Sequence, residues 1–125
     1  DVSGAVLVTT PQEMSLVDVK RANSMMRKTH VPVLGLIENM SWYVLPDGTR
    51  DPIFGEGVGA AWAEQERLPL LGQIPISRTV RESGDAGTPV VISHPDTEQA
   101  QALRVAARTL AGQVSIQALN TLPVL

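Results

Sequence analysis

The chain has 125 residues, a formal net charge of −3 and no cysteine. Its length allows at most one domain, and the lack of a basic tract argues against nucleic acid as a partner. Without cysteine, neither a disulfide framework nor a thiolate metal site is expected. No apolar run reaches the roughly 20 residues that span a bilayer, and no signal peptide opens the sequence. We therefore expect a cytoplasmic protein with no membrane partner.

The first part of the chain has the pattern of a strand, a helix and a second strand. Residues 4–9 and 31–38 are apolar runs that predict buried strands. Between them a helix is expected from about Pro11 to Thr29, because Thr10 and Glu13 have the spacing of a capping box. Its apolar stripe is expected to contain Leu16, Val19, Ala22 and Met26. The two strands are expected to pair in parallel through a right-handed crossover.

A long connection, residues 41–57, follows the second strand. It contains a turn signal at residues 46–49, and its segments 43–45 and 52–54 are candidates for a small hairpin. Long loops in compact domains are usually functional or disordered. Since this loop contains Trp42, Tyr43 and Phe54, we favour a folded loop that makes interactions.

The rest of the chain predicts two helices, a third strand and a final long helix. The first helix is expected at 58–67, the strand at 68–75, and a short helix is expected to be capped by Ser77 and ended by Gly84. The final helix is expected to take Asp96 as its cap. Its buried face is expected to hold Leu103, Ala106, Ala107, Leu110, Ala111 and Val114, and no element is predicted after Ser115.

These elements predict an α/β fold with three parallel strands and flanking helices. Three strands are few for such a sheet, because the edges of parallel strands need to be covered. We therefore expect part of a larger doubly wound parallel sheet.

The candidate binding residues gather where the strands end. Asn39 follows the second strand directly, and residues 74–89 follow the third, so both reach the carboxyl edge of the sheet, where ligands bind in this architecture. An amide carries both a donor and an acceptor and can pair with the edge of a base. A polar strand end or a cap explains Asn39 about as well.

Other candidates have plainer explanations. Glycines in residues 55–59 precede a helix, as in phosphate-binding turns, but the sequence has no Gly-Lys pair, and a flexible start to the helix fits better. Arg81 and its acidic neighbours fit a solvated helix surface about as well as a ligand site. His30 and His94 lack a second ligand at metal-binding spacing. The residues alone assign no catalytic or metal-binding side chain.

Five motifs occur in the order and at the spacing of one family. They are Val8-Thr9-Thr10-Pro11-Gln12, Gly35-Leu36-Ile37-Glu38-Asn39-Met40-Ser41, Ile53-Phe54-Gly55, Leu71-Gly72-Gln73-Ile74-Pro75 and Arg81-Glu82-Ser83-Gly84-Asp85-Ala86-Gly87-Thr88-Pro89. Over nearly residues 1–112 the chain resembles the Mrp/ApbC family of MinD-like P-loop ATPases, which carry iron–sulfur clusters. Residues 1–125 look like the C-terminal half of that ATPase domain.

The resemblance implies a nucleotide site that is shared between two halves of a domain. It implies that Asn39 reads the adenine of ATP and that the loop from Pro75 through Ile76 to Arg81 covers the base. The phosphate-binding loop and the acidic residues that hold magnesium belong to the N-terminal half of the family's domain. We therefore expect the N-terminal half as a partner, a homodimer as the assembly, and no ATP hydrolysis by this segment alone.

One departure from the family concerns the cluster. Many members place Cys-x-x-Cys in the loop after Glu-Asn-Met, where this chain has Leu45 and, near the second position, Gly48. Neither residue can coordinate iron, so binding of an iron–sulfur cluster by the usual ligands is not expected. Iron–sulfur apoproteins remain expected partners of the intact protein.

Two other functions compete with this interpretation. A non-catalytic interaction module would use Trp42 and Tyr43 to dock a partner. A membrane-positioning ATPase would need a basic amphipathic C-terminal helix, but residues 113–125 contain no Lys or Arg, which ranks this alternative low.

Overall fold

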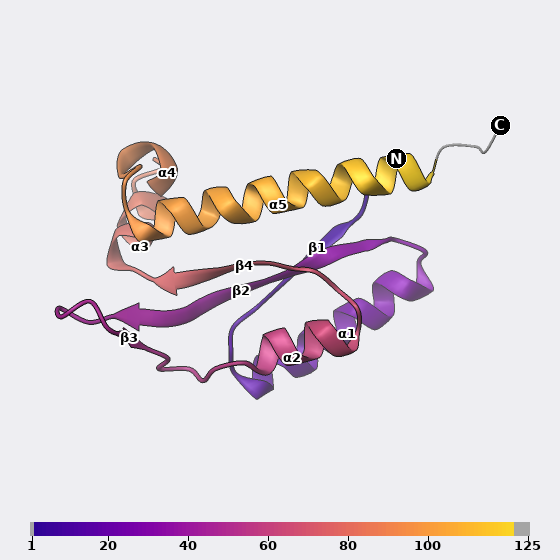
Figure 1. Cartoon of the computed structure of the whole chain (residues 1–125), viewed down its shortest axis with the longest axis horizontal. Helices are drawn as coiled ribbons and strands as arrows, with labels where there is room; N and C mark the ends of the chain where they lie inside the picture. Colours follow the sequence, from indigo (N-terminus) through magenta and orange to yellow (C-terminus); the bar gives the residue numbers. More distant parts are fainter. Residues whose placement is uncertain (1, 122–125) are drawn as a thin grey trace.

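Three parallel strands form the centre of the structure, which is a computed structural model describing residues 2–121 (Figure 1). Strand β2 (Val33–Val44) lies between β1 (Ala5–Thr9) and β4 (Leu70–Ile76) and pairs in parallel with both. The short strand β3 (Arg50–Asp51) pairs antiparallel with the end of β2. The sheet is therefore mixed, with a parallel centre.

Helices cover both faces of this sheet. Figure 1 shows α1 (Glu13–Lys28) and α2 (Val58–Gln65) on one side and the long helix α5 (Glu98–Asn120) on the other. Helices α3 (Arg78–Asp85) and α4 (Val90–Ser93) follow β4 at the carboxyl end of the sheet. This three-layer arrangement confirms the predicted α/β class and the strand–helix–strand unit.

The core lies between the sheet and the layer of α1 and α2. It consists of Leu7, Leu16, Val19, Leu36, Trp62 and Ala63. Leu36 is completely inaccessible to solvent in the central strand. Full burial of one such aliphatic side chain stabilises the fold by roughly 1.5–3 kcal/mol.

Strand β2 is longer than its sequence predicts. It was expected to end at Glu38 but continues to Val44, because its last residues pair with β3 and with Ile76 of β4. The hairpin in the long connection exists, but its second strand is residues 50–51 and not 52–54, so that register was wrong.

Both long helices begin one or two residues later than expected. Gln12 precedes α1 and makes no side-chain cap. The Thr10 hydroxyl instead donates to Ser15 Oγ at 2.6 Å, and Pro11 is buried before the helix begins. The predicted capping box between Thr10 and Glu13 was therefore wrong. For α5 the cap is Thr97, whose hydroxyl accepts from the Ala100 N–H and donates to the His94 carbonyl, and not Asp96.

The C-terminal part of the chain differs most from expectation. Helix α4 was not predicted, α3 runs past Gly84 to Asp85, and α5 continues beyond Ser115 to Asn120. The buried residues of α5 are Ala100 and Ala106, whereas Ala107 and Ala111 are exposed. The predicted stripe was therefore only partly correct, because the small side chains that let α5 approach β4 determine its buried face.

Candidate functional site

The carboxyl end of the parallel strands brings most of the predicted site residues together. Asn39 on β2 pairs in register with Ile74 on β4, which is followed by Pro75 and Ile76 at the end of that strand. Asn39 and Ile76 are half-buried, while Pro75 is buried. We call this edge of the sheet the rim, defined by Asn39, Pro75 and Ile76.

The Asn39 amide is held by the backbone next to it. Its Oδ1 accepts a hydrogen bond from the Met40 N–H at 2.9 Å, and Met40 has a left-handed φ of 59°. Left-handed backbone is uncommon for a residue other than glycine and is a form of local strain. Since an amide oxygen accepts two hydrogen bonds, Oδ1 keeps capacity for a ligand.

Arg81 lies on helix α3, which follows the rim in the chain. Its guanidinium pairs with Asp85 at 3.1 Å and Glu82 at 3.1 Å, and all three side chains are largely exposed. Ser77, by contrast, caps α3 as predicted, because its hydroxyl accepts from the Thr79 N–H. The cap fixes where the chain leaves β4, directly after the rim.

A row of polar side chains crosses the three parallel strands beside the rim. Thr9 of β1, Glu38 of β2 and Gln73 of β4 are neighbours in register. Glu38 is only 1% exposed, and its Oε1 accepts from Gln73 Nε2 at 3.1 Å and from Ser41 Oγ at 2.9 Å. The sequence motifs predict no role for Glu38. The signal was its spacing of two residues from buried Leu36, which puts both side chains on one face of the strand.

The other oxygen of Glu38 faces the first turn of α2. Glu38 Oε2 is buried without a hydrogen-bond partner among the described residues, and a Cβ built on Gly59 would lie 2.6 Å from it. The positive end of a helix dipole stabilises negative charge at this position. The Glu38 oxygen already lies against this turn, so an anion bound there would be close to a buried carboxyl group.

A cavity of about 230 Å³ opens beside this buried acid. It is lined by Glu38, Ser41, Trp42, Arg50, Pro52, Glu56 and Gln73. The guanidinium of Arg50 lies over the Trp42 ring, 4.0 Å from its centroid, and also pairs with Glu98 at 2.8 Å. Trp42, one of the two aromatics expected to dock a partner, is therefore covered within the chain, whereas Tyr43 is 43% exposed.

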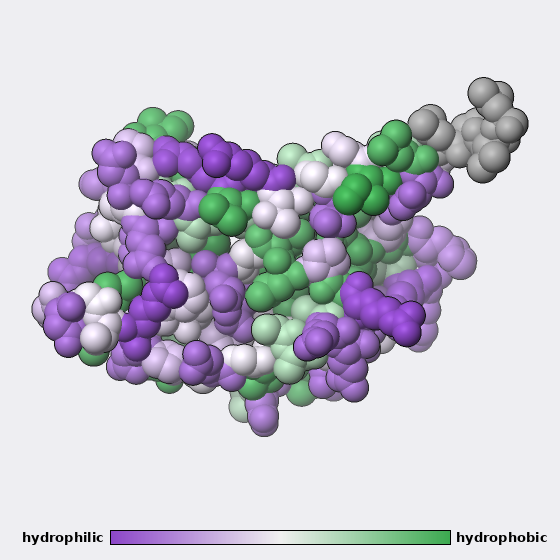
Figure 2. Space-filling view, viewed as in Figure 1, coloured by the Kyte–Doolittle hydropathy of each residue, from purple (hydrophilic) through white to green (hydrophobic). Residues whose placement is uncertain are grey.

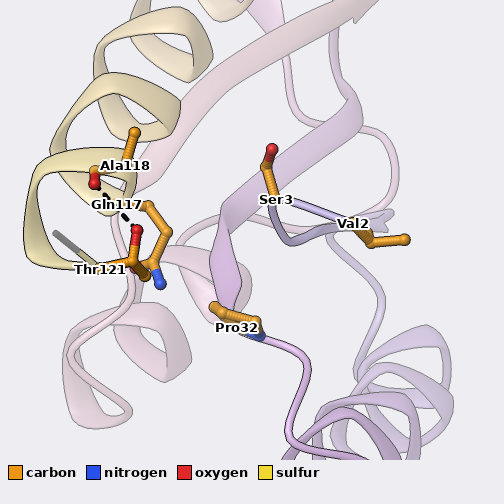
Figure 3. A pocket seen from close by; sticks show the side chains of 6 residues that line it. All are labelled: Val2, Ser3, Pro32, Gln117, Ala118 and Thr121. Atoms are coloured by element: carbon orange, nitrogen blue, oxygen red, sulfur yellow. Dashed lines mark hydrogen bonds between the residues drawn. The ribbon is translucent and has the colours of Figure 1, made fainter. Parts of the chain in front are cut away.

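A larger cavity, about 350 Å³, lies at the opposite end of the sheet (Figure 3). Val2, Ser3 and Pro32, which precede β1 and β2, line one side, and Gln117, Ala118 and Thr121 of α5 line the other. Ligands of open α/β sheets bind outside the carboxyl ends of the strands. This cavity lies at the amino ends of the strands, so the rim, at their carboxyl ends, is the better candidate site.

The side chains present do not fit an iron–sulfur cluster. Leu45 and Gly48, which take the family's cysteine positions, lie in and beside the turn of the hairpin and offer no side-chain donor. Within residues 2–121, no group of three or more His, Asp or Glu side chains is close enough to hold a metal ion. Among the described helices, none has the length and apolar character needed to cross a bilayer.

Solved structures of nucleotide-binding proteins share this fold. The septum site-determining protein MinD of Pyrococcus horikoshii, complexed with Mg-ADP, has a TM-score of 0.68 and 26% identity, over 92% of this chain and 44% of its own. A nucleotide-binding protein of Archaeoglobus fulgidus, in complex with ADP, has a TM-score of 0.64 and 36% identity, over 75% of this chain and 39% of its own. The fold defines the chain as part of a MinD-like P-loop NTPase sheet.

The sequence comparisons narrow this class. A family model described as NUBPL iron-transfer P-loop NTPase, of the ParA group, matches residues 1–111, and the chain belongs to this family. An iron–sulfur cluster carrier protein of Deinococcus radiodurans is 53% identical over 123 residues, which are 98% of this chain and 35% of that protein. The chain spans about a third of the curated relatives it matches. The resemblance predicted from the five motifs is confirmed.

Proposed function

We propose that this chain forms the adenine side of the ATP site in an iron–sulfur cluster carrier ATPase. In this proposal Asn39 reads the edge of the base, Pro75 and Ile76 form the adjoining wall, and Arg81 lies in the segment that covers it. The observation that carries the proposal is the place of Asn39. Asn39 is half-buried on the central strand, in register with Ile74 near the carboxyl end of β4, and its amide oxygen accepts from the Met40 N–H. This is where ligands of doubly wound sheets bind.

The open edge of β1 supports a second half of the domain as the partner. Among the described strands β1 pairs only with β2, and its Val8 is 57% exposed. Parallel strands are normally covered, because their backbone groups and apolar side chains are otherwise left to solvent. An upstream half that adds a strand beside β1 would cover this edge and supply the phosphate and magnesium ligands. Figure 2, in which β4 and α2 lie in front, shows apolar residues between α5 and the layer of α1 and α2.

An iron–sulfur cluster would be held differently here than in family members with a cysteine pair, because Leu45 and Gly48 take the positions of those cysteines. Several apolar side chains are exposed near the rim and the hairpin, namely Met40, Tyr43, Leu45, Ile53 and Phe54. Exposed apolar clusters mark interaction sites, and this one supports a homodimer or a client apoprotein as the partner. Any cluster would then be held by ligands from outside this segment.

The test of the proposal is Asn39→Ala in the protein produced with all upstream residues that its gene encodes. Binding of ATP and GTP is measured by calorimetry with magnesium present. Loss of the amide should weaken ATP binding about three- to tenfold, the effect of one hydrogen bond, and should leave GTP binding unchanged. Asn120→Ala, at the exposed end of α5, is the matched control and should bind as the wild type does.

Two results would contradict the proposal. One is a wild-type protein that binds ATP and GTP equally well. The other is an Asn39→Ala variant with the same preference for ATP as Asn120→Ala.

A further inference from the structure

We propose that Glu38 is a positioning residue that orients the Asn39 amide and so determines the preference for adenine. This inference rests on the proposed function. Glu38 is adjacent to Asn39 and points into the layer between the sheet and α2, where it is 1% exposed. Successive side chains of a strand point to opposite faces, so Glu38 lies on the other face of β2 from Asn39 and acts on a base held by Asn39 only through its neighbour.

Glu38 contacts three elements next to the rim: β2, β4 and α2. Its Oε1 accepts from Gln73 of β4 and from Ser41 of β2, and Oε2 packs against Gly59 of α2. Buried hydrogen bonds of this kind are strong because water does not compete for them. Movement of Glu38 would therefore shift the ends of β2 and β4 relative to each other.

A bulge in β2 follows Asn39. Between Asn39 and Tyr43 β2 advances four residues while β4, from Ile74 to Ile76, advances two. The extra residues fold Ser41 back, so that its Oγ lies 3.0 Å from the Glu38 carbonyl oxygen and 2.9 Å from Glu38 Oε1. This places Met40 in left-handed backbone, with its N–H on Asn39 Oδ1. The Glu38–Ser41 contact therefore closes the loop of backbone that holds the amide.

The two oxygens of Glu38 lie in different surroundings. Oε1 accepts two hydrogen bonds, whereas Oε2 faces Gly59 in the first turn of α2 and has no hydrogen-bond partner among the described residues. Glutamine has the same shape but one oxygen. Glu38→Gln would have to place its NH₂ group either against Gly59 or against the donors Ser41 and Gln73.

The experiment measures the ratio of ATP to GTP affinity in the protein with its upstream residues. Ser41→Ala removes one hydroxyl from a buried site without adding volume, and Glu38→Gln removes the second oxygen. Both should lower the ratio about three- to tenfold while GTP affinity stays within about twofold of wild type. Ser115→Ala is the control, since that hydroxyl bonds only to the Ala111 carbonyl of its own helix at 3.1 Å. A purely structural role would lower the melting temperature and leave the ratio unchanged.

The outcomes separate the two proposals. If the wild type prefers ATP and Ser41→Ala loses that preference, the positioning role is supported, even where Glu38→Gln fails to fold. If the wild type and Asn39→Ala behave as proposed but Ser41→Ala keeps the full preference, the positioning role is overturned and the adenine site stands. If the wild type has no preference, both proposals fail.

Discussion

The two halves of β2 follow different physical rules. From Val33 to Ile37 the strand is apolar, and pleated pairing on both sides buries Leu36 completely. From Glu38 to Val44 it carries a buried acid, a left-handed Met40, a bulge and an exposed Tyr43. The first half is stabilised mainly by removal of apolar surface from water, the second by specific hydrogen bonds. Apolar burial is concentrated at one end of the strand and polar contacts at the other.

The largest loss of stability is expected from a substitution in the regular half of β2, residues 33–37. Leu36→Ala should lower the free energy of unfolding by about 3–5 kcal/mol, because it leaves a cavity at a site with no access to solvent. Urea denaturation measures the change. Val105→Ala, at a 54% exposed position on α5, should change stability by no more than about 0.5 kcal/mol. Equal losses in the two variants would show that Leu36 is not at the centre of the core.

The next largest change in stability is expected at Gly59 of α2, which packs against Glu38 in the bulged half of β2. Gly59→Ala should destabilise the fold by about 1–3 kcal/mol, because its Cβ would lie 2.6 Å from Glu38 Oε2 and the carboxyl group must move. Helix propensity alone predicts the opposite sign. Gly84→Ala in α3, where a Cβ meets nothing within 4 Å, should stabilise by about 0.5–1 kcal/mol. Stabilisation of both variants by thermal melting would contradict the close packing of Glu38 against α2.

A smaller effect is expected where the hairpin joins the body of the protein. Arg50→Ala removes the contact with the Trp42 ring and the pair with Glu98, whose side chains are 59% and 39% exposed. The loss should be about 0.5–1 kcal/mol, and added salt should reduce it. Arg21→Ala, which breaks a more exposed pair with Asp18, should have a smaller effect in the same urea titration. Equal effects would show that the ring contact adds nothing.

The smallest effect is expected at the tip of the hairpin. The Thr49 hydroxyl and N–H both donate to Asp47 Oδ1, and these bonds hold the pKa of Asp47 below its ordinary value of 3.8. Because the pKa of Asp47 is lower in the folded turn than in the unfolded chain, the ionised carboxylate stabilises the turn at pH above 3.8. This stabilisation is lost as the pH falls through the lowered pKa. The Thr49 amide resonance should titrate with a midpoint below 3.8. Asp47→Asn should abolish the titration, and a midpoint at or above 3.8 would contradict the turn geometry.

The sequence could predict the regular half of β2 but not the bulged half. Apolar runs such as residues 33–37 specify a buried strand by themselves, and their order along the chain specifies the parallel sheet. The left-handed Met40 depends on Ser41 folding back onto Glu38, which no local pattern specifies. Asn39 could be placed at the rim because it directly follows the predicted strand. The hydrogen bond of Glu38 to Gln73 could not be predicted because Gln73 lies on another strand, although the spacing from Leu36 puts Glu38 on the buried face.

The same distinction explains the errors at the helix ends. Asp96 and Thr97 are both good caps, and the hydrogen bond from Thr97 to the His94 carbonyl decides between them. Helix α4 has four residues, too few for a periodic pattern to be visible. The covering of Trp42 by Arg50 depends on the hairpin register, which the turn signal at 46–49 left open.

The central claim is that this chain supplies the adenine wall of an ATP site whose phosphate ligands lie outside it. The most direct test is calorimetric titration of Mg-ATP into residues 1–125 and into the protein with its upstream residues, with far-ultraviolet circular dichroism to establish that both are folded. The account predicts a dissociation constant of about 1 mM or weaker for residues 1–125 and about 1 μM for the longer protein, a gap of roughly 4 kcal/mol. Micromolar binding by residues 1–125 alone would contradict it.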